Sequence, residues 1–138
     1  MCLHFDKKQT TALRARIKRL GGKVTCYKVL RRHVRDYATP AMRELRGKYT
    51  DILWPGPGIT KSDRKKKGLT LQEQKSGAVY KGIHVYSSRK CAVACAYGIH
   101  HVVPVTCSLD DFVAANRKEA VFMQVHLSKV AYARALRE

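Results

Sequence analysis

Residues 79–86, with the sequence Val-Tyr-Lys-Gly-Ile-His-Val-Tyr, begin the part of the chain that decides the fold. Apolar and polar side chains alternate here, which is typical of a half-buried β-strand. An Ala-rich helix follows, for which Ser88 is the expected N-cap. We predict a strand-rich core over residues 79–138. Two further strands are expected at residues 99–107 and 120–127, and two helices at residues 88–97 and 129–137.

The N-terminal part begins with an amphipathic helix. Leu13, Ile17 and Leu20 recur at helical spacing within residues 6–22, and a pair of glycines ends the pattern. Basic side chains flank this apolar stripe on both sides. The pattern predicts a basic helix that docks through a narrow stripe, with two residues available as its N-cap, Asp6 and Thr10.

The segments after this helix are predicted from β-branching and from turn residues. Residues 23–30 are rich in β-branched and aromatic side chains, which favours the first strand of the sheet. Pro40 favours the start of a helix that Gly47 would end. Two prolines and a run of lysines in residues 55–77 predict a mobile basic loop.

The size of the chain allows one ordinary core, since it has 138 residues and 45% of them are hydrophobic. We therefore expect a single compact α+β domain over residues 1–138, with a mainly antiparallel sheet and short helices. Its five cysteines are odd in number, and neither a secretory pattern nor a membrane-spanning apolar run is present. These features predict a soluble cytoplasmic protein with free thiols and no membrane partner.

The charge of the chain points to a polyanionic partner. Lys and Arg number 28 against 10 Asp and Glu, which gives a formal net charge of +18. Residues 1–75 carry 20 basic and 6 acidic side chains, a net +14, whereas the remaining 63 residues carry a net +4. Such an excess attracts DNA, RNA or a nucleoprotein, and we favour RNA slightly.

The basic residues expected to contact nucleic acid fall in three groups: the first helix, an arginine-rich segment and a lysine loop. A solvated surface would carry the same charges, and this alternative stays open. Stacking aromatics are available at Tyr37, Tyr49 and Trp54, each of which fits a core position equally well. The expected contact residues are Arg14, Arg16, Lys18, Arg19, Arg31, Arg32, Arg35, Lys65, Lys66 and Lys67.

Two other motifs contain residue types that are common in binding sites. Residues 56–62 resemble a phosphate-binding loop, but no Gly precedes Lys61 and no apolar helix follows, so a nucleotide site is not expected. A second group holds soft metal ligands within 17 residues, at a spacing that matches no common zinc knuckle. Close packing of the helix on the sheet is the stronger explanation of Cys91 and Cys95, and no metal site is predicted from Cys91, Cys95, His100, His101 and Cys107.

Four segments, residues 26–30, 82–88, 102–105 and 117–122, follow one another in an order that resembles the small catalytic domain of ADP-ribosyltransferases. The resemblance implies that NAD would be the cofactor. Lys28 stands where the family's Arg binds the dinucleotide phosphate, and Glu119 stands where the catalytic Glu engages the ribose. Ser87 and Ser88 stand where part of a Ser-Thr-Ser strand end lines the nicotinamide pocket.

The same chain departs from that family in three respects. Lys28 lacks the bidentate fork of an arginine, the middle Thr of the Ser-Thr-Ser motif has no counterpart, and Arg117 occupies the place of an additional Glu found in many members. Taken on their own, three of these residues have structural explanations: Lys28 as a surface charge, Ser88 as a helix N-cap and Glu119 as a solvated residue at a strand start. Enzymatic transfer of ADP-ribose from NAD is therefore the alternative hypothesis, and a binding protein without a cofactor is the first.

The segments around residues 82–88 and 119–122 also resemble short bacteriophage accessory proteins. That resemblance implies interference with a host machine as the role of a basic binding protein. Inhibition of an RNA-guided defence complex, as anti-CRISPR proteins perform it, would use the positive charge directly. The partner would then be a ribonucleoprotein, or a host protein complex, in the host cytoplasm.

Overall fold

The fold is described from a computed structural model of the chain. It describes residues 3–34, 43–47, 53–54, 56–96 and 100–137. Within residues 32–34, 43–47 and 53–54 it describes the backbone, and only the side chains of Leu45 and Trp54. The main sheet contains, in spatial order, β5 (Gly58–Lys61), β11 (Gln124–Leu127), β8 (His100–Ser108), β2 (Lys23–Val34), β7 (Ile83–Tyr86), β10 (Glu119–Phe122) and β9 (Phe112–Ala115).

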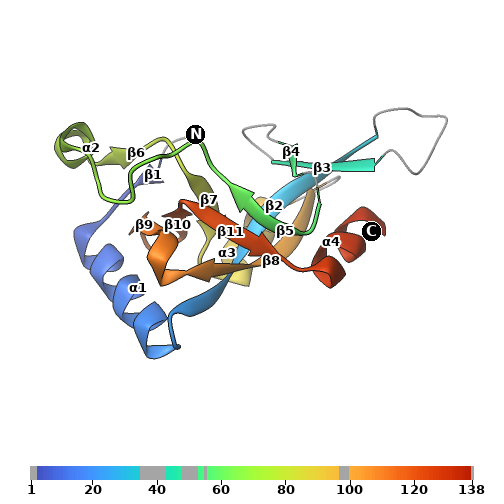
Figure 1. The fold of residues 1–138 in the computed structure, drawn as a ribbon, viewed down its shortest axis with the longest axis horizontal. Coiled ribbons are helices and arrows are strands. Elements are labelled where there is room, and N and C mark those ends of the chain that lie inside the picture. The colour runs from blue at the N-terminus through green and yellow to red at the C-terminus, as the bar shows by residue number, and fades with distance from the viewer. Residues whose placement is uncertain (1–2, 35–42, 48–52, 55, 97–99, 138) are drawn as a thin grey trace.

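Four short strands and five helical segments complete the fold (Figure 1). β3 (Arg43–Gly47) pairs with β2 and with β4 (Leu53–Trp54), whereas β1 (Leu3–His4) and β6 (Ala78–Val79) form a separate two-stranded sheet. All the described strand pairs are antiparallel. This confirms an α+β fold with a mainly antiparallel sheet. The helices are α1 (Lys7–Arg19), α2 (Leu71–Ser76), α3 (Arg89–Cys95) and α4 (Lys129–Arg137), with a 3₁₀ turn at Leu109–Asp111.

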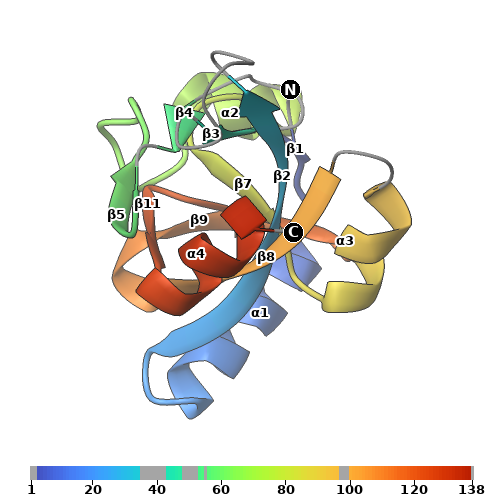
Figure 2. The ribbon, with the colours of Figure 1, turned by 90° about the vertical axis from the view of Figure 1, so that its right-hand side faces the viewer.

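The long strand β2 is the centre of the fold. It spans 12 residues and pairs with β8 along most of its length, then with β3 near its end. Its alternating side chains enter two clusters: Cys26 and Leu30 join the main core, whereas Val29 packs with Tyr86 and Ala92 on the other face. Figure 2 shows α4 and α3 on opposite sides of this part of the sheet.

The predicted N-terminal helix is confirmed as α1. The Asp6 carboxylate caps it by accepting hydrogen bonds from the backbone N–H groups of the next turn, at 2.8 and 3.2 Å. The Thr10 hydroxyl donates to the Ala115 carbonyl and accepts from the Ala115 N–H, both at 3.0 Å, and so ties the helix to β9. Leu20 was predicted in the apolar stripe, but it follows the last turn and is 57% exposed.

Two N-terminal predictions are wrong. The helix expected over residues 40–47 is the strand β3 in its described part, because Leu45 is fully buried opposite Trp54 of β4. Trp54 is therefore a core residue rather than a stacking aromatic. Residues 55–77 are not a continuous loop, since β5 pairs with β11 and a Thr70–Glu73 capping box forms α2.

The C-terminal predictions are confirmed with more breaks than expected. Ser88 caps α3 through a 3.3 Å hydrogen bond from Cys91, and the last helix forms as α4. Residues 79–86 divide into β6 and β7 around Gly82, whose φ of 130° and close approach to Val121 leave no room for a Cβ atom. Residues 120–127 divide into β10 and β11, and β9 was not predicted. None of the described helices is long and apolar enough to cross a membrane.

Candidate nucleic-acid interface

An open groove of about 840 Å³ runs between α1 and the segment before α2, and we call it the α1 groove. One wall is an edge of α1, where Lys7, Arg14 and Lys18 are exposed. The opposite wall contains Lys67, which comes from a segment about fifty residues further along the chain. Apolar residues complete the lining, among them Phe5, Leu69, Leu109, Phe112 and Val113.

The four cations of the α1 groove keep their charge available. Within the described part of the chain, none of them takes part in an ion pair. The Arg14 guanidinium lies 5.4 Å from the centre of the Phe112 ring, an arrangement that orients the cation without neutralising it. Asp110 lines the groove beside them, so positive charge prevails over negative by four to one.

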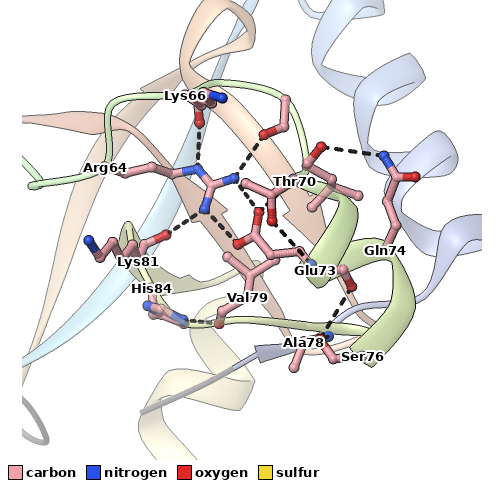
Figure 3. A network of polar contacts seen from close by, with 12 residues as sticks. Arg64, Lys66, Thr70, Glu73, Gln74, Ser76, Ala78, Val79, Lys81 and His84 are labelled. Carbon is pink, nitrogen blue, oxygen red and sulfur yellow. Dashed lines mark hydrogen bonds and ion pairs between the residues drawn. The ribbon is translucent and has the colours of Figure 1, made fainter.

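The wall that carries Lys67 is held by a buried arginine (Figure 3). Arg64 is 7% exposed, and its guanidinium donates two 2.8 Å hydrogen bonds to the two carboxylate oxygens of Glu73. It also donates to the carbonyls of Lys66 at 2.7 Å and Gly68 at 2.9 Å, on either side of Lys67. Arg64 is therefore a positioning residue for this wall and not a contact residue.

The electrostatics of Glu73 follow from this network. Hydrogen bonds from the Arg64 guanidinium, with a smaller contribution from the Thr70 N–H, lower the pKa of Glu73 from 4.5 to about 2. The carboxylate is thus charged at any pH at which the protein is expected to work. Sequence reasoning missed Arg64 and Glu73, although the Thr70-x-x-Glu73 pattern is a capping box that could have indicated α2.

The structure brings together only part of the predicted basic surface. Arg16 and Arg19 are exposed on α1, but they do not line the groove. Lys65 and Lys66 are exposed next to Lys67 and line a neighbouring pocket. Arg31 is half-buried near the other end of β2 from α1, and Arg32 lies there too, with its side chain outside the described residues. The predicted positions Arg35, Tyr37 and Tyr49 also lie outside the described residues.

The residues of the ADP-ribosyltransferase resemblance occupy three adjacent strands. Lys28 lies on β2, Ser87 follows β7, and Glu119 begins β10, in the order β2, β7, β10. Desolvation lowers the pKa of Lys28 to about 8, although the nearby carboxylate of Glu119 opposes the shift. Desolvation likewise raises the pKa of Glu119, and Lys28 opposes that shift. The two groups therefore interact across the strand between them.

The hydrogen bonds of these residues serve the fold. The Lys28 ammonium donates to the His84 carbonyl at 2.7 Å, and the Ser87 hydroxyl donates to the Lys118 carbonyl at 3.2 Å. Ser88 is the N-cap of α3. The three groups that would bind a dinucleotide are thus engaged with backbone atoms.

Comparisons with protein-family models, with curated proteins and with solved structures find no match to this chain. In the α1 groove, charge, exposure and shape coincide.

The cysteines and histidines that were weighed as metal ligands do not gather in one place. Cys107 is fully buried in the main core, where its thiol interacts with that of Cys26. Cys91 and Cys95 pack instead beside Ala92 in the cluster on the other face of β2. Among the described residues, no group of three or more His, Cys, Asp or Glu side chains is placed to hold a metal ion.

Proposed function

We propose that the protein binds nucleic acid, and RNA in preference to DNA, in the α1 groove. The observation that carries the proposal is the convergence of Lys7, Arg14, Lys18 and Lys67 on one open groove. None of these cations forms an ion pair within the described residues, and Lys67 interacts with Asp111 only at longer range, so phosphates would mainly replace counterions. Cations that are dispersed over the N-terminal half of the sequence thus line the same groove and could bind one ligand together.

The geometry favours contacts to the phosphate backbone over contacts to base edges. The face of α1 that bears Thr10 and Ile17 is buried on the domain, so only one edge of this helix borders the groove. A recognition helix of a DNA-binding protein would instead project into the major groove. We therefore expect binding of low sequence specificity that weakens as the salt concentration rises.

The experiment is a comparison of charge-neutralised variants by fluorescence anisotropy with a labelled RNA oligonucleotide. The groove variant combines Arg14→Gln, Lys18→Gln and Lys67→Gln. In 0.1 M salt each lost phosphate contact weakens binding about fivefold, so the triple variant should bind on the order of a hundredfold more weakly. A matched control removes three exposed charges from α4 on the far side of the molecule, at Lys129, Arg134 and Arg137.

The control should bind within about threefold of the wild type, because its charges act only through the long-range field. An equal loss in both variants would show that net charge alone drives binding, and the groove would not be the site. Circular dichroism of each variant checks that the fold is retained. A DNA oligonucleotide of the same sequence measures the preference for RNA.

Interference with a host ribonucleoprotein is the wider role that we propose. It is supported by the resemblance to short bacteriophage accessory proteins and by the expected affinity for RNA. A purified RNA-guided nuclease should cleave its target more slowly in the presence of the protein, and the groove variant should restore cleavage. Equal rates with and without the protein would remove this role while leaving nucleic-acid binding intact.

The alternative function, transfer of ADP-ribose from NAD, has one observation in its favour. Lys28 and Glu119 interact across β7, which lies between their strands, in the order that the resemblance implies. The hydrogen bonds of Lys28, Ser87 and Ser88 to backbone atoms weigh against it. Consumption of NAD by the wild type that Glu119→Gln abolishes would establish the enzyme, whereas no consumption by the wild type would remove it.

A further inference from the structure

A second pocket, of about 600 Å³, adjoins the lysine segment on the side away from the α1 groove, and we call it the Tyr80 pocket. Tyr80 lines it with a side chain that is 65% exposed, which is unusual for a large aromatic residue with an apolar ring. Lys65, Lys66 and Lys81 line the same pocket and are exposed as well. An aromatic face and three cations thus share one surface with the exposed Asp63, so exposed positive charge exceeds negative by three to one.

The walls of the Tyr80 pocket are fixed relative to each other. Arg64 donates to the Lys66 carbonyl at 2.7 Å and to the Lys81 carbonyl at 3.2 Å, so one buried guanidinium holds both walls (Figure 3). Tyr80 lies directly between Lys81 and Val79, which is fully buried and paired with Leu3 of β1. The tyrosine therefore projects from a backbone that is anchored on both sides.

The lysine segment connects the two surfaces. Lys65 and Lys66 line the Tyr80 pocket, whereas the next residue, Lys67, lines the α1 groove. A polyanion that follows the α1 groove and crosses this segment would meet the exposed ring of Tyr80. Base stacking on an aromatic ring requires an unpaired base, because bases within a duplex are already stacked on their neighbours.

We propose that the ligand is single-stranded nucleic acid, with one base stacked on Tyr80 and its flanking phosphates bound by the lysines of the pocket. This inference rests on the proposed function, and it adds that the nucleic acid is single-stranded. Aromatic stacking adds affinity with little dependence on base identity, so the low sequence specificity expected for the α1 groove is retained.

The test compares Tyr80→Ala and Tyr80→Phe on two labelled probes, a 12-nucleotide single-stranded RNA of mixed sequence and the duplex that it forms with its complement. We expect Tyr80→Ala to weaken binding of the single strand about tenfold, the order of one base–aromatic stack, and to change duplex binding less than twofold. Tyr80→Phe keeps the ring and should bind both probes as the wild type does.

The salt dependence provides a second readout. Because Tyr80→Ala removes no charge, the slope of log affinity against log salt should stay that of the wild type. Unchanged binding of the single strand by Tyr80→Ala, or an equal loss on both probes, would overturn the inference. If the α1 groove variant still weakens binding in that case, the proposed function stands; if neither probe binds the wild type, the proposed function itself fails.

Discussion

Replacement of Arg64 by Met should release the segment that carries Lys67. Removal of the guanidinium leaves the carboxylate of Glu73, whose side chain is 12% exposed, without its two 2.8 Å hydrogen bonds. Removing one partner of a buried ion pair costs about 3–5 kcal/mol. The fall in the pKa of Glu73 from 4.5 to about 2 gives a similar figure, since 2.5 pH units correspond to about 3 kcal/mol. Solvent near the carboxylate reduces the cost, so we expect about 2–3 kcal/mol.

The loss should appear as local opening, because every residue of α2 other than the half-buried Glu73 is exposed. Native-state hydrogen exchange measures it at the amides of Gln74 and Gly77, which bond to Thr70 and Glu73 within the helix. Their protection should fall about 30- to 150-fold in Arg64→Met. In a matched control, Lys66→Met, it should stay unchanged, because only the carbonyl of Lys66 takes part in the network. Protection within twofold of the wild type in Arg64→Met would refute the reasoning.

The charge on Glu73 gives the same prediction a pH dependence. A carboxylate whose pKa is lowered on folding contributes stability above its unfolded pKa of 4.5, and this contribution is lost as the pH falls toward about 2. Protection of α2 in the wild type should decrease over that interval, whereas Glu73→Gln should be nearly flat. The double variant Arg64→Met with Glu73→Gln should be more stable than Arg64→Met alone, because no unpaired charge remains.

Three further changes test the rest of the account. Lys28→Met should stabilise the protein at pH 7 by up to about 3 kcal/mol, because burial lowers the pKa of Lys28 from 10.5 to about 8. This gain in stability should shrink between pH 8 and 10.5. A variant that urea titration shows to be less stable than the wild type would contradict this. Thr10→Val should cost about 1–3 kcal/mol, since Ala115 loses two hydrogen bonds; an unchanged urea midpoint would show that β9 does not depend on them. Gly82→Ala should lower the melting temperature through its φ of 130° and its contact with Val121, and equal melting would disprove that constraint.

Local signals in the sequence were sufficient for several elements. The carboxylate of Asp6, the glycine pair after α1 and the hydroxyl of Ser88 act within one turn of their helices, so these ends could be placed from the sequence. The strand β8 likewise follows its own alternation of buried and exposed residues. Elements of this kind depend mainly on neighbouring residues.

Other elements depend on partners that are distant in the sequence. Leu45 is in a strand because Trp54 and the end of β2 surround it, whereas the local signal of Pro40 favoured a helix. Residues 112–115 of β9 are all buried, so they show no alternation that would predict a strand. These segments could not be assigned from local pattern alone.

The candidate site was predictable in composition but not in arrangement. The sequence indicated Arg14, Lys18 and Lys67 as contact residues, and the structure places them around one groove. It also indicated Arg31, which lies near the other end of β2 from α1. Arg64 counted as one more positive charge, yet its burial against Glu73 removes it from the surface. Only the folded chain separates positioning cations from cations that are free to bind.

The most direct test of the central claim is the salt dependence of RNA binding by the wild type and the α1 groove variant. The four groove cations alone contribute about −3 to the slope of log affinity against log salt for a single strand. The variant that lacks the charges of Arg14, Lys18 and Lys67 should have a slope about 2 shallower than that of the wild type, since each contact contributes about 0.7. The α4 control should keep the slope of the wild type. Equal slopes for the wild type and the groove variant would contradict the assignment of the α1 groove as the nucleic-acid site.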